Sequence, residues 1–192
     1  MLMKDWRKEV FTIPNLLSLF RLLLIPVYVM IYLRAQDNTD YYLAAGILAV
    51  SCLTDLIDGK IARHFNMISS LGKLLDPIAD KATQFALIMC FTVKYRILWY
   101  LLGLFILKEG FQLIACGVSY HKGKVLKGAL LSGKICTTVL FISLILMVMM
   151  PGLHERAVEI IALIDGIFML AAFFDYVIAY FFKESKFQFL ND

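Results

Sequence analysis

Six apolar stretches, each long enough to cross a lipid bilayer, limit the folds open to this chain more than any other feature. A transmembrane helix needs about 20 predominantly apolar residues. With 61% hydrophobic and 18% charged residues in 192, the chain is more apolar and less charged than soluble domains. A soluble enzyme, a disordered chain and a nucleic-acid-binding module are therefore excluded, and we predict an all-α polytopic membrane protein with six transmembrane helices. The stretches comprise residues 15–34, 41–62, 73–93, 97–119, 131–150 and 157–182.

The residues before the first stretch predict a separate short helix. MLMKDWRKEVF mixes charged and apolar residues, and it lacks the small-residue cleavage site of a signal peptide. We therefore expect residues 1–13 to form an amphipathic helix at the membrane interface. Residues 15–182 then form the six-helix bundle, and the whole chain, 1–192, is predicted to be a single domain.

The lysines and arginines predict the orientation of the bundle. If the N-terminus lies in the cytoplasm, most of these residues fall at cytoplasmic helix ends, as the positive-inside rule requires. Six spans return the C-terminus to the same side, so we expect both termini in the cytoplasm. The membrane that we expect is a bacterial cell membrane. The opposite ends receive only Arg34, Lys94, Arg96 and Arg156.

Four aspartates gather on the second and third stretches. Asp55 and Asp58 are three residues apart, and Asp76 and Asp80 are four apart, so each pair shares a helical face. The short loop between the two helices makes them antiparallel neighbours, and the four carboxylates can converge near the cytoplasmic ends. Such a cluster requires cations to neutralise it.

Two interpretations of this cluster follow from the residue types. Oxygen ligands without histidine or cysteine indicate a hard ion, Mg²⁺ or Mn²⁺, and two such ions commonly assist displacement at phosphorus. The alternative is a structural network, in which the aspartates pair with neighbouring basic residues. The two acidic pairs on consecutive helices favour the metal site. The candidate partners in a network are Lys60, Arg63, Lys73 and Lys81.

The aspartates belong to a longer motif that resembles the signature of the CDP-alcohol phosphatidyltransferases, D-x2-D-G-x2-A-R-x8-G-x3-D-x3-D. Residues 12–26, TIPNLLSLFRLLLIP, are similar to the N-terminal region of the phosphatidylglycerophosphate synthases and of eukaryotic-type cardiolipin synthases. Within the family, the chain is most similar to the phosphatidylglycerophosphate synthases. Every fixed position of the signature is present: Asp55, Asp58, Gly59, Ala62, Arg63, Gly72, Asp76 and Asp80.

The resemblance implies a phosphotransferase of phospholipid biosynthesis. Members of the family have six transmembrane helices, usually as homodimers among membrane lipids, with the site open to the cytoplasmic leaflet. They transfer the phosphatidyl group of CDP-diacylglycerol to an alcohol and release CMP. By position, Asp55, Asp58, Asp76 and Asp80 would hold two divalent ions, Mg²⁺ or Mn²⁺, and Asp80 would also be the general base. The CDP-binding surface would comprise Gly59, Ala62, Arg63 and Gly72.

Basic residues in the second half bear on the acceptor alcohol. Lys134 lies in a Ser-Gly-Lys segment that resembles the GK-x-KT segment of the phosphatidylglycerophosphate synthases. With Lys127 and Lys108 it would bind an acceptor phosphate, which favours glycerol 3-phosphate. Lys108 precedes Glu109, so a structural ion pair explains it equally well. The synthases commonly show Arg-Glu at the position of Lys108-Glu109 and a second arginine further along the same helix. This second arginine is absent here, and the matching position is near Cys116.

Two alternatives therefore stay open. Phosphatidylglycerol, the acceptor of the cardiolipin synthases, would suit the chain without that arginine. A divalent-cation transporter could use the same carboxylates, but transporters usually show repeated halves, and this sequence shows none.

Three further charged residues fall inside the apolar stretches. Arg21 could extend its charged end to the membrane interface or be buried against the acidic cluster, and we favour burial. Asp165 and Asp175, on the last stretch, are expected to be structural polar groups with partners.

Overall fold

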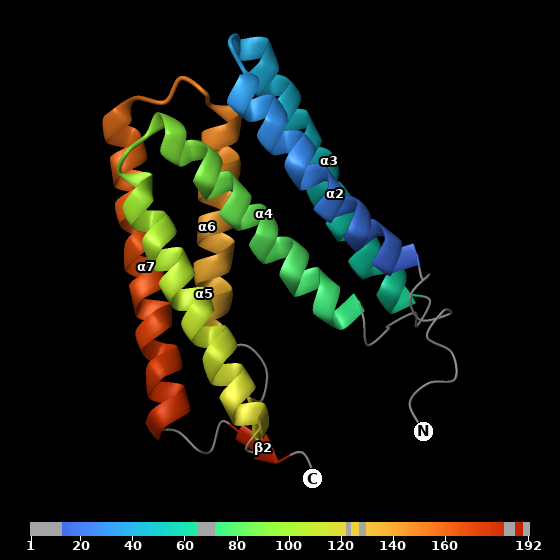
Figure 1. Cartoon of the computed structure of the whole chain (residues 1–192), viewed down its shortest axis with the longest axis vertical. Coiled ribbons are helices and arrows are strands. Elements are labelled where there is room, and N and C mark those ends of the chain that lie inside the picture. Colours follow the sequence, from blue (N-terminus) through green and yellow to red (C-terminus); the bar gives the residue numbers. More distant parts are fainter. Residues whose placement is uncertain (1–12, 65–71, 122–123, 127–129, 183–186, 190–192) are drawn as a thin grey trace. The chain divides into compact units, whose positions relative to one another are not determined.

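The computed structural model describes residues 13–64, 72–121, 124–126, 130–182 and 187–189, with side chains described at 15–54, 75–119 and 130–181. Residues 1–12, which carry most of the predicted interfacial helix, lie outside these ranges. The described residues form six helices and two three-residue strands (Figure 1). The helices are α2 (Ile13–Arg34), α3 (Asn38–His64), α4 (Gly72–Lys94), α5 (Leu98–His121), α6 (Leu131–Met149) and α7 (Glu155–Phe182).

Each predicted apolar stretch corresponds to one helix, and the short connection between α2 and α3 makes these two helices antiparallel. Helix α3 starts close behind α2, where the Asp40 carboxylate accepts a hydrogen bond from the backbone N–H of Gln36 at 3.0 Å. An acidic side chain in a first turn also suits the positive end of the helix dipole. Between α4 and α5, the Tyr95 hydroxyl donates to the carbonyl of Leu153 at 3.1 Å. This bond ties that loop to the loop before α7.

Four of the described helices are long and apolar enough to cross a membrane. They establish an integral membrane protein with four candidate spans, whereas six spans stay a prediction. Helices α3 and α4, which carry the aspartates of the signature, are not among the four. Large apolar side chains lie exposed on the candidate spans, as lipid-facing surfaces require; Leu113 and Phe181 are 74% and 72% exposed. The spans are Asn15–Arg34, Leu98–Ser119, Leu131–Met149 and Glu155–Phe181.

The chain divides into two compact units, which we describe separately. The first comprises Met1–Cys90 with Val148–Pro151, and the second comprises Phe91–Met147 with Gly152–Asp192. In the first unit, α2 and α3 pack against each other as an antiparallel pair. Tyr32, near the end of α2, meets the edge of Tyr41, near the start of α3, and stacks on Tyr28 within α2.

Three helices of the first unit meet around one small cavity of about 10 Å³. This is room for at most one water molecule. The helices α2, α3 and α4 are therefore neighbours of one another. The cavity is lined by Leu24, Ile25 and Tyr28 of α2, by Ile47, Leu48 and Ser51 of α3, and by Thr83, Ala86 and Leu87 of α4.

In the second unit α5 packs along α7. A small core of Leu130, Tyr176 and Ala179 closes one end, with Phe111 and Tyr180 against it. Strand β1 (Lys124–Leu126) pairs antiparallel with β2 (Phe187–Phe189). The sequence analysis did not predict these strands, because three residues are too few to show the alternation that marks a strand.

Candidate active site

Two of the four predicted metal ligands, Asp76 and Asp80, lie one turn apart on α4. The Asp80 side chain is 51% exposed, and Asp76 is half-buried. Between them Ala79 is fully buried against the rest of the unit. The helix therefore packs through Ala79 while both carboxylates stay within reach of a ligand.

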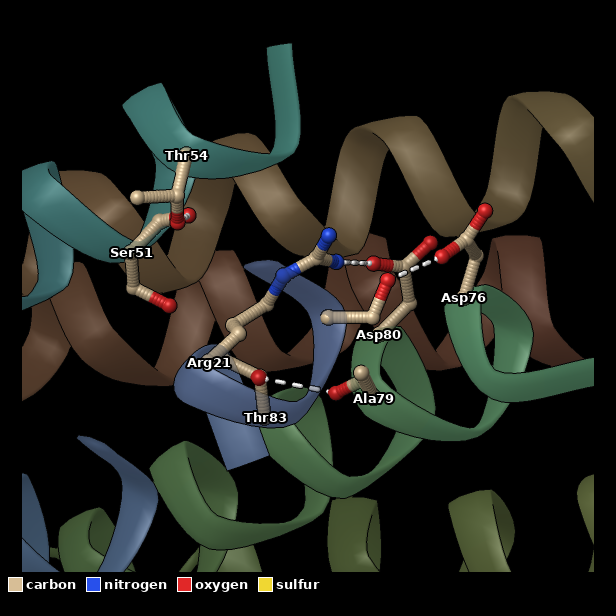
Figure 2. A network of polar contacts seen from close by, with 8 residues as sticks. Arg21, Ser51, Thr54, Asp76, Ala79, Asp80 and Thr83 are labelled. Carbon is tan, nitrogen blue, oxygen red and sulfur yellow. Dashed lines mark hydrogen bonds and ion pairs between the residues drawn. The ribbon is translucent and has the colours of Figure 1, made fainter. Parts of the chain in front are cut away.

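Both carboxylates are bound by polar side chains of α2. The Ser18 hydroxyl donates to Asp76 Oδ1 at 2.5 Å, and Arg21 Nη1 lies 2.5 Å from Asp80 Oδ1 (Figure 2). Ser18 and Arg21 are 0% and 3% exposed. The prediction that Arg21 is buried against the acidic cluster is confirmed.

The order of these contacts gives the relative direction of the two helices. The earlier residue of α2, Ser18, binds the earlier aspartate, and the later residue, Arg21, binds the later one. Helices α2 and α4 therefore run parallel, with their N-terminal ends on the same side. This is the direction that three successive antiparallel spans require.

Helix α3 carries the other half of the signature. Ser51, which lines the junction with α4, is followed four and seven residues later by Asp55 and Asp58. Positions spaced in this way lie on one face of a helix. The side chains of Asp55, Asp58, Gly59, Ala62 and Arg63 are outside the described set, although α3 extends through all five; Gly72 is the first residue of α4.

Two hydroxyls at this junction are satisfied within their own helices. Thr83 Oγ1 donates to the carbonyl of Ala79 at 2.8 Å, and Thr54 Oγ1 donates to the carbonyl of Ser51 at 2.7 Å (Figure 2). Such bonds let hydroxyl side chains lie between packed helices without a partner from another helix. Ser18 and Arg21, in contrast, contact the carboxylates.

The donor chemistry of this site fits a hard divalent cation. Asp76, Asp80 and the Ser18 hydroxyl supply oxygen atoms, the ligands that Mg²⁺ and Mn²⁺ prefer. Among the described side chains, no group of three or more histidines, cysteines or acidic residues is close enough to hold a metal ion. The side chains of Asp55 and Asp58, the other two predicted ligands, lie outside that set.

The predicted acceptor lysines differ in their surroundings. Lys108 is 4% exposed, and its Nζ lies 2.7 Å from Glu109 Oε1, so the ion pair that the sequence allowed is present. Lys134 is exposed near the start of α6. Lys127 lies outside the described residues. Of the described lysines in this set, Lys134 has the more accessible ammonium group.

Asp165 and Asp175 of α7 have partners, as predicted, and both partners are serines of α6. Ser143 Oγ donates to Asp165 Oδ1 at 3.0 Å, and Ser132 Oγ donates to Asp175 Oδ2 at 2.5 Å. Asp165 is 2% exposed. These carboxylates hold α6 and α7 together.

The role of Ser18 was not predicted from the sequence. A signal was available, because Asn15, Ser18 and Arg21 are polar residues at three-residue spacing within an apolar stretch. All three are buried. A buried polar stripe on a membrane helix indicates a polar partner inside the protein.

Comparison with known proteins gives the family. Residues 11–177 match the model of the CDP-alcohol phosphatidyltransferase family. The chain belongs to this family. The match includes α2, where Ser18 and Arg21 lie, and extends into α7.

Individual phosphatidyltransferases similar to the chain carry two different names. The chain is 35% identical over 118 residues to a cardiolipin synthase (CMP-forming) of Streptomyces coelicolor, covering 60% of this chain and 54% of that protein. It is 37% identical over 89 residues to the CDP-diacylglycerol–glycerol-3-phosphate 3-phosphatidyltransferase of Escherichia coli K12, covering 46% of this chain and 48% of that protein. A cardiolipin synthase–hydrolase fusion of Schizosaccharomyces pombe is 38% identical over 122 residues, 62% of this chain and 19% of the fusion. The chain thus matches about half the length of the two bacterial relatives.

Proposed function

We propose that this chain transfers a phosphatidyl group from CDP-diacylglycerol to the hydroxyl of glycerol 3-phosphate, releasing CMP and forming phosphatidylglycerophosphate. The observation that carries the proposal is the accessible pair Asp76 and Asp80, each bound by a buried side chain of α2. These two aspartates complete the signature of the family to which the chain belongs. Carboxylates that are accessible and held in one orientation suit a ligand-binding role better than a role in helix packing.

In this proposal the four aspartates of the signature hold two divalent ions, Mg²⁺ or Mn²⁺. The face of α3 that carries Ser51 also carries positions 55 and 58, and Ser51 lines the junction with Thr83 of α4. Because α3 and α4 are antiparallel, the segment of α3 from Ser51 to Asp58 runs alongside the segment of α4 from Thr83 back to Asp76. When bound, the ions would neutralise the diphosphate and the departing CMP.

Asp80 acts as the general base. The acceptor oxygen forms a bond to the phosphorus that bears diacylglycerol, and the diphosphate P–O bond to CMP breaks. The hydroxyl proton passes to the Asp80 carboxylate, which is half exposed and can reach an acceptor. Arg21, bound at Oδ1, keeps the carboxylate in one orientation. A base held in place in this way contributes to the rate.

The remaining signature residues would bind the nucleotide. Gly59, Ala62 and Arg63 lie in the last turns of α3, and Gly72 begins α4. Small residues allow a ligand close to the backbone, and an arginine can bind a phosphate through two parallel hydrogen bonds.

Lys134, together with Lys127 and Lys108, would bind the phosphate of glycerol 3-phosphate. The exposed position of Lys134 supports this. Phosphatidylglycerol is the second candidate acceptor, and two observations support it. The match to a cardiolipin synthase covers more of the chain, 60% against 46%, and Lys108 is already paired with Glu109.

We further propose a homodimer in a bacterial cell membrane, with both termini and the site on the cytoplasmic side. The lysine and arginine distribution supports the orientation.

The decisive experiment measures CMP release by the purified full chain, with CDP-diacylglycerol and Mg²⁺ fixed and only the acceptor varied. Turnover with glycerol 3-phosphate supports the proposal. Turnover with phosphatidylglycerol alone would make the chain a cardiolipin synthase. No CMP with either acceptor would contradict the reaction, and divalent-ion flux into sealed liposomes without CDP-diacylglycerol would instead support the transporter. The Asp80→Asn chain serves as the blank.

A further inference from the structure

Arg21 is a charged residue inside a candidate membrane span. It lies seventh in the span Asn15–Arg34 and is 3% exposed. A buried charge in such a segment is costly unless it has a partner. Its Nη1 lies 2.5 Å from Asp80 Oδ1, so the positive charge of Arg21 is fixed inside the acidic site.

The two members of this ion pair differ in accessibility. The Arg21 side chain is 3% exposed, whereas that of Asp80 is 51% exposed. The cation is thus anchored in the protein, while its carboxylate is open to a second cation. A carboxylate has two oxygens and about four lone-pair sites, so Arg21 and an incoming ion can share it.

The neighbouring aspartate has a neutral partner instead. Asp76 receives the hydroxyl of Ser18, a group that orients a carboxylate without neutralising it. Asp80 is therefore the one of these two described carboxylates whose negative charge is compensated by a cation. The same helix, α2, supplies both kinds of partner.

We propose that Arg21 is a resident counter-charge of the acidic site, which compensates Asp80 before a divalent ion binds and lowers the affinity with which the site then holds that ion. This inference rests on the proposed function, since the ion is the one that Asp76 and Asp80 would bind there. Positive charges at short separation repel each other, so the guanidinium opposes a metal ion on the shared carboxylate. Arg21 is accordingly a positioning residue.

The test compares Mn²⁺ binding to the full chain in detergent, followed by electron paramagnetic resonance. Arg21→Gln keeps a hydrogen-bond donor but removes the charge, and we expect it to bind Mn²⁺ roughly tenfold more tightly than the wild type. Arg21→Lys keeps the charge and should stay within about twofold. The matched control is Arg34→Gln, the same charge change at an exposed position about 20 Å along the same helix, which should leave the affinity unchanged.

A second measurement uses thermal unfolding, which does not depend on activity. Without metal, Arg21→Gln should unfold at a lower temperature than the wild type, because Asp80 has lost its counter-charge. Added Mn²⁺ should raise the unfolding temperature of Arg21→Gln by more than it raises that of the wild type. If Arg21→Gln does not fold without metal, Mn²⁺ during purification or the additional change Asp80→Asn should restore folding.

The outcomes separate this inference from the proposed function. A wild-type chain that binds no Mn²⁺ overturns both the metal site and the role of Arg21. Mn²⁺ binding that is equal or weaker in Arg21→Gln overturns only the role of Arg21. Failure of both rescues would also overturn it, since Arg21 would then be needed for packing and not for charge.

Discussion

The two units of this protein treat acidic residues inside helices in different ways. In the first unit Asp80 is half exposed and faces the guanidinium of Arg21. In the second, Asp165 is 2% exposed and faces the neutral hydroxyl of Ser143. Both carboxylates have partners, so pairing alone does not mark a functional site. Accessibility combined with a charged partner distinguishes Asp80 from the buried Asp165, whose contact holds two helices together.

The largest expected effect follows from removing one charge in each unit. Asp80→Asn should lower CMP release by roughly a hundredfold to ten-thousandfold, the usual contribution of a general base. Asp165→Asn should retain most of the activity, because its side chain is closed to ligands. CMP release measures the first effect, and thermal unfolding confirms that both variants are folded. Loss of activity in a folded Asp165→Asn chain would remove the distinction between the two units.

Much of the first unit was predictable from sequence. The apolar stretches give the helices, because a backbone that crosses lipid must satisfy its own hydrogen bonds within a helix. The spacing of Asp76 and Asp80 gives their common face, and a charge within an apolar stretch gives the burial of Arg21. Each of these follows from residues on one helix.

What the sequence left undetermined depends on how helices align with one another. The bond from Ser18 to Asp76 depends on the relative shift of α2 and α4, and a serine within a helix can equally bond its own backbone. The close approach of Gly133 to Tyr176 depends likewise on how α6 packs against α7. Spacing along one helix contains no information about such shifts.

That close approach provides a test of the second unit. A Cβ added at Gly133 would lie 2.6 Å from the Tyr176 hydroxyl and 2.8 Å from Cε2. Tyr176 is 2% exposed and has little room to move, so Gly133→Ala should reduce the free energy of unfolding by about 1–3 kcal/mol. Thermal or denaturant unfolding in detergent measures this.

Two further variants sharpen the result at Gly133. Adding Tyr176→Phe removes the closest atom but leaves Cε2, so it should restore part of the loss and not all of it. Gly103→Ala is the matched control within a helix, since nothing lies within 4 Å of its added Cβ; it should leave stability unchanged or raise it by about 0.5–1 kcal/mol. Equal losses at Gly133 and Gly103 would contradict the packing described here.

Removing one serine from each unit compares the two kinds of carboxylate directly. Ser143→Ala takes a hydrogen bond from the buried Asp165, which should reduce the free energy of unfolding by about 1–3 kcal/mol with activity retained. Ser18→Ala takes one from the half-buried Asp76, where water can replace it, so the loss of stability should be smaller and the loss of activity larger. The pair of measurements is CMP release and unfolding for each variant. The reverse pattern would place the functional carboxylate in the second unit.

The smallest effect separates the two acceptors. Lys134→Gln removes an exposed charge, and the free energy of unfolding should change by no more than about 0.5 kcal/mol. If Lys134 binds the phosphate of glycerol 3-phosphate, the KM for that acceptor should rise by up to about tenfold while kcat changes less. The lysine would hold the acceptor equally in the bound state and in the transition state, so its loss weakens acceptor binding and not the chemical step. Arg156→Gln, another exposed charge in the same unit, should leave this KM unchanged. If KM is unchanged in Lys134→Gln and phosphatidylglycerol is the better acceptor, Lys134 does not bind the acceptor and contributes only to the orientation of the protein in the membrane.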